Sequence, residues 1–538
     1  MTQDQIKQLE KELWDAADAL RANSKLTAAE YKDPVLGLVL LRFAQNKYEE
    51  ATPIVQKNIP SGPRGKREAN KEDYLSAGAI MLPEKAKYEY LAALPEGKDI
   101  AEAINNAMKL IEAEYPDLQG NLPKNYQEFE SDLLRDLVRV FNKDAVKKAT
   151  GDVFGRIYEY FLMKFSMQGA GAQEGGEFFT PPSLVQLIVN FIEPDHGIIH
   201  DPACGSGGMF VQTGYFVKDH SNKEINEAIK CYGTEQKTNN TKLAKINLAI
   251  HGIEGKIIEA NSFYSDPHNL LGKCDFVMAN PPFNVNKVDK GKDFVKTDPR
   301  LPFGLPKADN ANYMWMQYFS SYLNDKGRAG FVMASSATDA GHSEKLIRQQ
   351  LIESGVVDCI VSVGNNFFYT RSLPCHVWFY DKGKSKLPAV SSSAVENKAG
   401  RKNGPNTILM IDARNVFRKV TTTISDFSED QLEGLTAIMK LYRGEKPTVA
   451  KNNTWFKERF PEGKYNDIEG LCKIVTLDEV IENDYSLTPG RYVGVTFVED
   501  DGVDFKGRLV EIQEELDALN KEATQLAKTI SNNLKELI

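Results

Sequence analysis

The first 150 residues carry their apolar side chains at the spacing of an α-helix. Several of them follow the three- and four-residue intervals of one helix face: Ile6, Leu9, Leu13, Ala16, Ala17 and Leu20. A second helical stretch follows around residues 34–50. The pattern predicts a helical domain at the start of the chain.

Two segments lack this periodicity. Residues 57–73 are rich in Pro, Gly and charge, with five basic and three acidic side chains. Residues 383–404 are rich in Ser, Gly and Lys, with five basic residues and one acidic residue. Both compositions predict mobile loops. For the first loop a solvated surface is the favoured interpretation, and a nucleic-acid contact is the alternative.

From about residue 180, short apolar runs alternate with helix-like segments. Seven runs predict strands: residues 198–201, 230–234, 257–260, 274–279, 329–334, 356–362 and 375–380. Strands that alternate with helices form parallel sheets with helices on both faces. The predicted fold class is therefore α/β, with a doubly wound, Rossmann-like parallel sheet.

The end of the chain has a different pattern. Apolar residues recur there at alternating intervals of three and four, with one polar position: Leu509, Ile512, Leu516, Leu519, Ala523, Leu526, Ile530, Asn533 and Leu537. This spacing is typical of a coiled-coil seam. A helix that offers its seam to another subunit is slightly favoured over a helix packed into the core of its own domain.

These patterns divide the chain into four predicted parts. They are a helical N-terminal domain (1–150), the sheet-containing domain (151–420), a connecting region (421–504) and a C-terminal helix (505–538).

Composition excludes several classes of protein. With 41% hydrophobic and 26% charged residues, the 538-residue chain has the composition of a globular protein and not of a fibrous or disordered one. Its longest apolar runs are about eight residues, and a membrane span needs about 20, so we expect no membrane segment. The first residues lack the layout of a signal peptide.

Charge and cysteine content add two expectations. The net charge of −9 predicts that the chain does not bind nucleic acid tightly over its whole surface, although a local basic groove or a partner can supply positive charge. Six cysteines without a CxxC pair, and seven histidines without HExxH, predict no metal site. Low cysteine use also predicts a cytoplasmic location.

The first chemical motif follows the first predicted strand. Residues 201–208 read DPACGSGG, and glycines at such a position let the backbone approach a ligand. Ligands of open α/β sheets bind beyond the carboxyl ends of the strands. The motif is neither a P-loop nor a GxGxxG turn.

Polar residues also end the next two strands. Glu235 follows the second strand, where a carboxylate can accept both hydroxyls of a ribose, although a carboxylate at a helix start is the alternative. Asn261, Ser262 and Phe263 follow the third strand, where a polar group and an aromatic ring could read and stack an adenine.

The fourth strand ends in Asn280, Pro281, Pro282 and Phe283. The lone pair of the adenine exocyclic amine is delocalised into the ring. The Asn280 side-chain oxygen and the Pro281 carbonyl can accept hydrogen bonds from both amine hydrogens, which moves the nitrogen toward sp³ and exposes its lone pair to a sulfonium methyl. The prolines remove donors from the turn, and Phe283 offers a face on which an extruded base can stack.

In order along the chain, FTPP (179–182), DPACGSGG (201–208), Glu235 and NPPF (280–283) resemble the motifs of S-adenosylmethionine-dependent amino-group DNA methyltransferases. More narrowly, the chain resembles the modification subunit of type I restriction-modification systems. Residues 13–43, 176–189, 365–382 and 485–493 carry this likeness, which covers nearly the whole chain.

The resemblance implies a role for each matching position. Glu177, Phe178, Phe179, Thr180, Pro181 and Pro182 are expected to contact the methionine part of S-adenosylmethionine, and Asp201, Gly205, Ser206, Gly207 and Gly208 to line the same pocket. Glu235 is expected to bind the ribose hydroxyls, Asn261 the cofactor adenine, and Asn280 and Phe283 the target adenine. Many relatives have Asp where this chain has Asn261.

The resemblance also implies partners. We expect double-stranded DNA with a flipped adenine, a separate specificity subunit bound through the C-terminal helix, and a second copy of this chain in the complex. A restriction subunit can add to it. The expected function is site-specific methylation of the N6 amine of adenine in DNA.

Other interpretations remain. Methyltransferases for RNA or for a protein glutamine amide also use Asn-Pro-Pro-aromatic, but they are expected to be shorter. A non-catalytic scaffold for a specificity subunit would show damaged motifs. Pro374-Cys375 is similar to the nucleophile of C5-cytosine methyltransferases, but amine methylation needs no nucleophile. Cys375 lies in an apolar strand, where a buried structural thiol is favoured.

Overall fold

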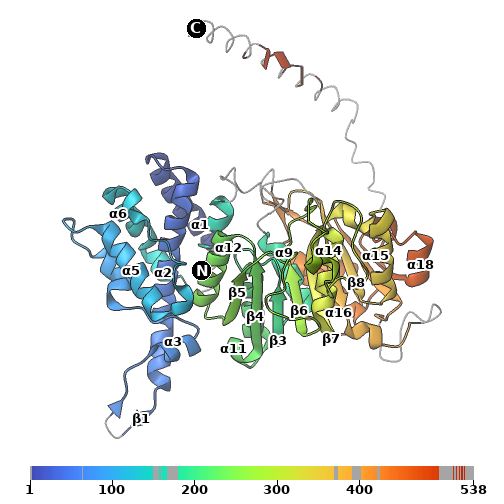
Figure 1. The fold of residues 1–538 in the computed structure, drawn as a ribbon, viewed down its shortest axis with the longest axis horizontal. Helices are drawn as coiled ribbons and strands as arrows, with labels where there is room; N and C mark the ends of the chain where they lie inside the picture. Colours follow the sequence, from blue (N-terminus) through green and yellow to red (C-terminus); the bar gives the residue numbers. More distant parts are fainter. Residues whose placement is uncertain are drawn as a thin grey trace. The chain divides into compact units, whose positions relative to one another are not determined.

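A computed structural model describes residues 3–62, 65–149, 157–158, 160–165, 180–368, 374–390, 402–420 and 424–495, with single helical residues between 513 and 526. The chain forms two compact units, Met1–Val493 and Gly494–Ile538. Figure 1 shows the helices and the sheet of the first unit.

The start of the chain is helical, as the apolar spacing predicts. The longer helices are α1 (Gln3–Ala22), α2 (Ala28–Asn58), α5 (Ile100–Glu114) and α6 (Ser131–Phe141). Shorter turns lie between and after them: η1 (Glu84–Ala86), α4 (Tyr88–Ala92), η2 (Pro116–Leu118), η3 (Tyr126–Glu128) and α7 (Asp144–Lys147). Ile6, Leu9, Leu13 and Ala17 are buried in the core of this domain, which confirms the predicted face of α1.

The predicted loop at residues 57–73 has more regular structure than expected. Strands β1 (Ser61–Gly62) and β2 (Gly65–Lys66) pair antiparallel, and α3 (Lys71–Ser76) begins inside the segment. The Asn70 side chain accepts the N–H of Asp73, and the Asp73 carboxylate accepts the N–H of Asn70. This capping box starts a helix without any apolar periodicity, so the periodicity alone could not reveal it.

A nine-stranded sheet follows, and it contains all seven predicted strands. They are β3 (Gly197–Asp201), β4 (Ile229–Glu235), β5 (Gly255–Glu259), β6 (Cys274–Ala279), β7 (Leu323–Ala334), β8 (Val357–Val363) and β9 (Cys375–Asp381). The predicted strands do not include β10 (Thr407–Ala413) and β13 (Cys472–Thr476), or the small hairpin of β11 (Arg418–Lys419) and β12 (Ser425–Asp426). The sheet order is β13-β10-β8-β9-β7-β6-β3-β4-β5.

The sheet is mixed, which corrects the prediction of a parallel one. Strand β9 runs antiparallel to both β7 and β8, and β13 runs antiparallel to β10. Val363 at the end of β8 pairs with Cys375 at the start of β9, so β9 begins at the edge of the sheet where β8 ends. A chain that re-enters at the same edge must reverse its direction.

Helices cover both faces of the sheet. Along β7 and β9, Phe331 and Trp378 belong to one buried cluster, whereas Val332 and Phe379 belong to the other. This alternation is the two-residue period of strands that are buried on both faces. The doubly wound arrangement is therefore confirmed.

The helices of the sheet domain differ in size. The longer ones are α9 (Pro182–Ile192), α10 (Gly208–His220), α12 (Thr238–Ile250), α14 (Asn312–Tyr322), α15 (His342–Glu353) and α16 (Glu429–Tyr442). The shorter ones are α11 (Ile225–Ala228), α13 (Asp293–Lys296), η5 (Ser335–Thr338), η6 (Gly383–Lys386), α17 (Thr454–Arg459), α18 (Leu477–Glu482) and η7 (Pro489–Arg491).

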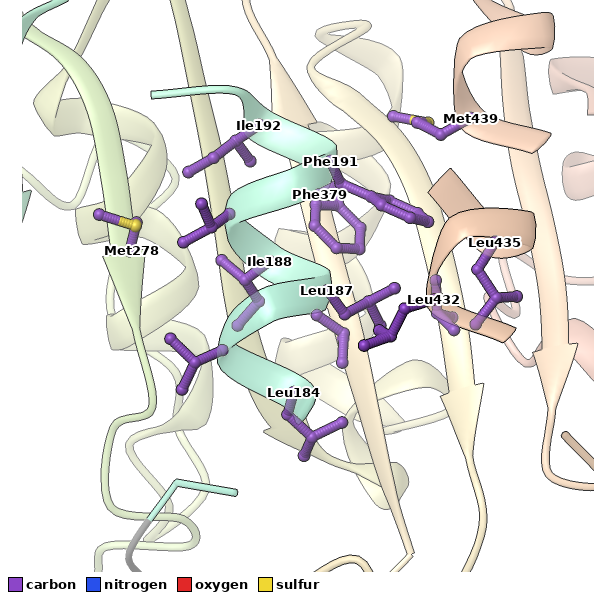
Figure 2. Packing of buried hydrophobic residues seen from close by; sticks show 14 of the residues in the cluster. Leu184, Leu187, Ile188, Phe191, Ile192, Met278, Phe379, Leu432, Leu435 and Met439 are labelled. Carbon is purple, nitrogen blue, oxygen red and sulfur yellow. The ribbon is translucent and has the colours of Figure 1, made fainter. Parts of the chain in front are cut away.

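Helix α9 packs against the sheet on one side and against α16 on the other. Figure 2 shows its apolar side chains between Met278 and Phe379 of the strands and Leu432, Leu435 and Met439 of α16. The ring centroids of Phe191 and Phe379 lie 4.7 Å apart. Because α9 is buried on nearly every side, the residues just before it have a firmly placed support.

The helical N-terminal domain contacts the sheet domain through α12. Ile246 of α12 is buried in the core of the helical domain, and Phe43 lies 5.0 Å from the ring of His251. Figure 1 shows α12 between these helices and the edge strand β5.

The second unit contains the predicted C-terminal seam. Leu516, Ala523 and Leu526 are helical and exposed. The remaining seam positions, Leu509, Ile512, Leu519, Ile530, Asn533 and Leu537, lie outside the described residues. Among the helices that the structure describes, none has both the length and the apolar character that crossing a bilayer requires.

A buried ion cluster holds the amino end of β8. The Asp358 carboxylate is fully buried and lies 3.1 Å from the Arg443 guanidinium and 3.6 Å from the Lys384 ammonium. Arg443 also donates to the Phe191 carbonyl, and Lys384 donates to the Val357 and Thr407 carbonyls. Burial lowers the pKa of Lys384. Asp358 is therefore the nearest counter-ion of two cations that have little access to water, and Glu193 lies 3.9 Å from Arg443 as a second, more distant one.

We predict that Asp358→Ala lowers the free energy of unfolding by about 3–5 kcal/mol, because it removes the nearest counter-ion of two buried cations. Chemical denaturation followed by circular dichroism would measure this loss. The matched control is Asp325→Ala, which removes the partner of Lys386 in a largely exposed pair and should change stability little. Equal effects of the two variants would contradict the prediction.

Candidate active site

The turn after β3 brings backbone close to a possible ligand. Gly205 and Gly207 have φ angles of 54° and 79°, in the left-handed region that favours glycine. A Cβ atom on Gly207 would lie 3.0 Å from Leu248 Cδ1, so the turn also packs closely against α12. Helix α10 begins at Gly208, directly after this turn. Ser206 offers its carbonyl to the Asn247 side chain at 3.0 Å.

Glu235 lies at the end of β4, beside this turn. Its carboxylate accepts the backbone N–H of Gly205 at 2.9 Å and that of Lys237 at 2.8 Å, and the residue is 7% exposed. The alternative of an exposed carboxylate at a helix start is therefore wrong. The contact with Gly205 holds the glycine-rich turn and the end of β4 together.

Asp201 ends β3 and is 1% exposed. It accepts the N–H of Ala203 at 3.0 Å. Burial, assisted by the nearby Glu235 carboxylate, raises the pKa of the Asp201 carboxyl to about 8. Two acidic side chains thus face each other across the turn, where a positively charged ligand would stabilise the ionised form of both.

The segment after β5 is tied to the same turn. The Ser262 hydroxyl donates to the Pro202 carbonyl at 2.6 Å. The Asn261 side-chain oxygen accepts the N–H of Phe263 at 2.9 Å, so this oxygen closes a local turn. Phe263 is 5% exposed and packs 4.6 Å from Trp315 in the core. Burial leaves little of its ring for stacking on an adenine.

Asn280 follows β6, the strand on the other side of β3. Its side-chain N–H₂ donates to the Thr180 hydroxyl at 2.9 Å. Thr180 belongs to the FTPP motif, 100 residues earlier in the chain. The structure therefore brings the predicted cofactor motif and the predicted catalytic turn into direct contact.

Phe283 ends the catalytic turn. It is 7% exposed, and its ring meets the ring of Phe368 edge to face, with 6.1 Å between the centroids. The next residue, Asn284, has a φ angle of 54°. The Asn284 N–H donates to the Asn312 side-chain oxygen at 2.9 Å, and Asn310 and Asn312 both donate to the Asn284 side-chain oxygen. This amide cluster fixes where the turn ends.

The described site residues thus form two connected groups. Asp201, Gly205, Glu235 and Asn261 lie around the ends of β3, β4 and β5, and Thr180 contacts Asn280 at the end of β6. Glu177, Phe178 and Phe179 lie outside the described residues. Pro181 is the N-cap of α9, and Pro182 is the first residue of this helix.

Phe368 and Asn312 contribute to the site, although no sequence signal identified their roles. The NNFFY segment that contains Phe368 resembles a family segment, but this resemblance does not show that its ring meets Phe283. Asn312 lies 28 residues after Asn284, at the start of α14, and only the folded loop brings them together.

Cys375 does not belong to the site. Cys375 is fully buried in β9, and burial raises the pKa of its thiol to about 12, as expected for a structural cysteine. Among the described residues, no three His, Cys, Asp or Glu side chains gather in a way that could hold a metal ion.

Comparison with known proteins agrees with this geometry. Residues 149–501 match the N-6 DNA Methylase family, and residues 9–141 match the HsdM N-terminal domain. The type I restriction enzyme MjaIX methylase subunit of Methanocaldococcus jannaschii is 34% identical, over 99% of this chain and 91% of that protein. The HindI methylase subunit of Haemophilus influenzae is 31% identical, over 82% of this chain and 94% of that protein.

Solved structures show the same fold. The type I restriction-modification methyltransferase subunit from Streptococcus thermophilus superimposes with a TM-score of 0.67 at 20% identity, over 91% of this chain and all of that one. A chain from a study of type I complex assembly has a TM-score of 0.54 at 18% identity, over 97% of this chain and 98% of that one.

The matches extend over both the helical domain and the sheet domain, and they include the segments that carry the two motifs in contact. They do not support the alternatives of an RNA or protein-glutamine methyltransferase or of a non-catalytic scaffold. The chain belongs to the N-6 DNA methylase family, as the subunit of a type I restriction-modification system that methylates the N6 amine of adenine in DNA.

Proposed function

We propose that S-adenosylmethionine is the methyl donor and that it binds against the glycine-rich turn and Glu235, which contact each other. The residues present fit this group. Gly205 and Gly207 present backbone without a side chain at two positions of the turn, and the Glu235 carboxylate is held in place by two backbone N–H groups. When bound, the cofactor supplies an electrophilic methyl group on a sulfonium centre.

The raised pKa of Asp201 supports the same assignment. A buried carboxyl that faces a second carboxylate favours a cationic ligand, and S-adenosylmethionine carries an ammonium and a sulfonium group. Glu235 accepts the ribose hydroxyls. The amide N–H₂ of Asn261 contacts the adenine, since its oxygen already accepts the N–H of Phe263. Glu177 to Pro182 flank the methionine part.

Methyl transfer depends on the turn that begins at Asn280. We place the adenine amine between the Asn280 side-chain oxygen and the Pro281 carbonyl, which accept its two hydrogens. The nitrogen lone pair would then be free to attack the methyl group that the bound cofactor supplies, and the amine would lose one proton. We assign stacking on the flipped base to Phe283, whose ring is 7% exposed and must be uncovered for this contact. The Asn280–Thr180 contact is the observation that carries this proposal.

We propose that another chain recognises the DNA sequence. With a net charge of −9, this subunit should bind DNA weakly by itself. We propose that the C-terminal helix binds a specificity subunit through its apolar seam, that two copies of this chain join one specificity subunit, and that a restriction subunit can add to them. Leu516 and Leu526, at 58% and 55% exposure, are available for such a contact.

Two further expectations stay predictions. The four-part division of the chain is consistent with family matches that meet between residues 141 and 149, but its boundaries are not tested. We also propose a cytoplasmic location, in agreement with six cysteines that are all free.

We predict that Glu235→Gln weakens S-adenosylmethionine binding by about one to two orders of magnitude, because it removes charge-assisted hydrogen bonds of about 1.5–3 kcal/mol. Isothermal titration calorimetry would measure the dissociation constant. The control is Glu259→Gln, an exposed residue at the end of the neighbouring β5, which should bind normally. Unchanged affinity of the Glu235 variant would place the ribose elsewhere.

We predict that Asn280→Ala lowers methyl transfer in the assembled complex by about 10²–10³-fold, as expected for a group that acts in the transition state. Cofactor affinity should survive, and Phe283→Ala should cost less. Transfer of labelled methyl to cognate DNA would measure the rate, with the exposed Asn286→Ala as control. Near-normal activity of Asn280→Ala would overturn the proposed mechanism.

We predict that Leu516→Glu combined with Leu519→Glu prevents assembly with the specificity subunit, because charges in an apolar seam are costly to bury. Co-purification and methylation of cognate DNA would both be lost, whereas cofactor binding should remain. The control exchanges two residues away from the seam, Asp517→Ser with Lys521→Ser. Normal assembly of the leucine variant would mean that the partner docks elsewhere.

A further inference from the structure

We propose that the loop from Lys287 to Asp309, which follows the catalytic turn, binds the phosphate backbone of the DNA near the target adenine. Lys287 and Lys307 are its central contacts. This inference rests on the proposed role of the Asn280 turn, and it adds a surface that holds the DNA beside that turn.

Both ends of the loop meet at the catalytic turn. The Ala311 N–H donates to the Val285 carbonyl at 2.9 Å, and the Asn312 side chain donates to the Asn284 side-chain oxygen at 2.9 Å. Asn284 directly follows Phe283. A base that leaves the double helix stays attached to its sugar and phosphates, so the backbone of the target strand must pass close to this turn.

Lys287 and Lys307 lie near these two ends. The Lys287 N–H donates to the Asp309 carboxylate at 2.6 Å, and the Lys307 N–H donates to the Ser343 hydroxyl at 2.9 Å. Hydrogen bonds thus fix both backbones, and both residues are exposed. Among the residues that the structure describes, neither ammonium group forms an ion pair. Each is therefore available to a phosphate.

The loop is positive within an acidic chain. It has six basic and four acidic residues, whereas the whole chain has a net charge of −9. Three of the four acidic side chains have partners inside the loop. Asp289 and Asp309 each accept a backbone N–H group, and Asp298 is buried against the Arg300 guanidinium at 2.7 Å. The ammonium groups are left for an external partner.

An aromatic ring distinguishes this loop from a merely solvated surface. Phe294 is 41% exposed, and its neighbours Lys292 and Lys296 are exposed as well. The Arg300 guanidinium lies 5.6 Å from the centre of the ring. Exposed rings among cations are typical of surfaces that bind nucleic acids, where bases stack on the ring and cations follow the backbone.

The loop is also a firm support for these side chains. Val295 and Leu301 are buried in one hydrophobic core with α14. The Gln317 side chain, on α14, accepts the Phe303 N–H and donates to the Gly304 carbonyl, both at 2.9 Å. A surface that is already ordered loses little conformational freedom when it binds.

Lys287→Gln combined with Lys307→Gln tests the proposal in the complex of this chain with its specificity subunit. Each phosphate contact contributes about 0.9 to the slope of log affinity against log salt concentration, so this slope should fall by about 1.8. The dissociation constant at low salt should rise about tenfold. Both losses should be equal on cognate and unrelated DNA, because phosphates carry no sequence information.

Fluorescence anisotropy of labelled duplexes between about 50 and 200 mM salt would measure the slope and the affinity. Lys287→Arg with Lys307→Arg keeps the charge and should keep the slope. The matched control, Lys223→Gln with Lys230→Gln, removes the same charge from exposed positions near the amino end of β4, away from the catalytic turn. Its slope and affinity should stay close to those of the original chain. Affinity for S-adenosylmethionine, which should be normal in every variant, reports the fold.

A smaller salt slope in the Lys287 and Lys307 glutamine variant, with normal slopes in the arginine variant and the matched control, supports the proposal. An unchanged slope would overturn it and make the loop a solvated surface. An equal loss in the matched control would overturn it in favour of a general effect of net charge. Loss of co-purification with the specificity subunit would assign the loop to a protein partner instead of DNA. Failure of the proposed function would appear separately, as high activity of Asn280→Ala.

Discussion

The parallel pairing of β3 with β4 on one side and β6 on the other is the constraint on which the site depends. Parallel strands end at the same edge of a sheet, so their connections collect there. From β3 the chain moves outward through β4 and β5, whereas β6 and β7 extend the sheet the other way. At such a reversal the loops diverge and leave a crevice. Asp201 ends β3 and Asn280 follows β6, on the two sides of this reversal.

Hydrogen bonds across this edge turn separate strand ends into one site. Glu235 reaches the Gly205 N–H, Ser262 reaches the Pro202 carbonyl, and Asn280 reaches Thr180. Each bond joins segments that are far apart in sequence. The polar groups are mostly buried, so each bond also satisfies a group that would otherwise be costly to remove from water.

The buried ion cluster at the amino end of β8 has a structural role. Asp358, Lys384 and Arg443 hold β8, η6 and the end of α16 through buried charge pairs. Strand β9 lies between β7 and β8 and runs antiparallel to both. Phe368, in the segment that follows β8, meets the ring of Phe283. The acidic net charge of the chain is consistent with our proposal that a partner supplies positive charge and sequence recognition.

The sequence by itself determined the helical start, the seven strands from β3 to β9, and the residue types at their ends, because strand and helix periods and turn residues are local signals. Local patterns also indicated Asp201, Glu235 and the Asn280 turn as candidate site residues. Strands β10 and β13 were not predicted, although residues 407–413 form an apolar run of the kind that indicated the other strands. Only the tertiary structure decided that β9 runs antiparallel, that Phe263 is buried, and that Thr180 and Asn312 hold the catalytic turn. Those contacts join residues from about 30 to 100 positions apart, and no local pattern records which distant side chain will meet which.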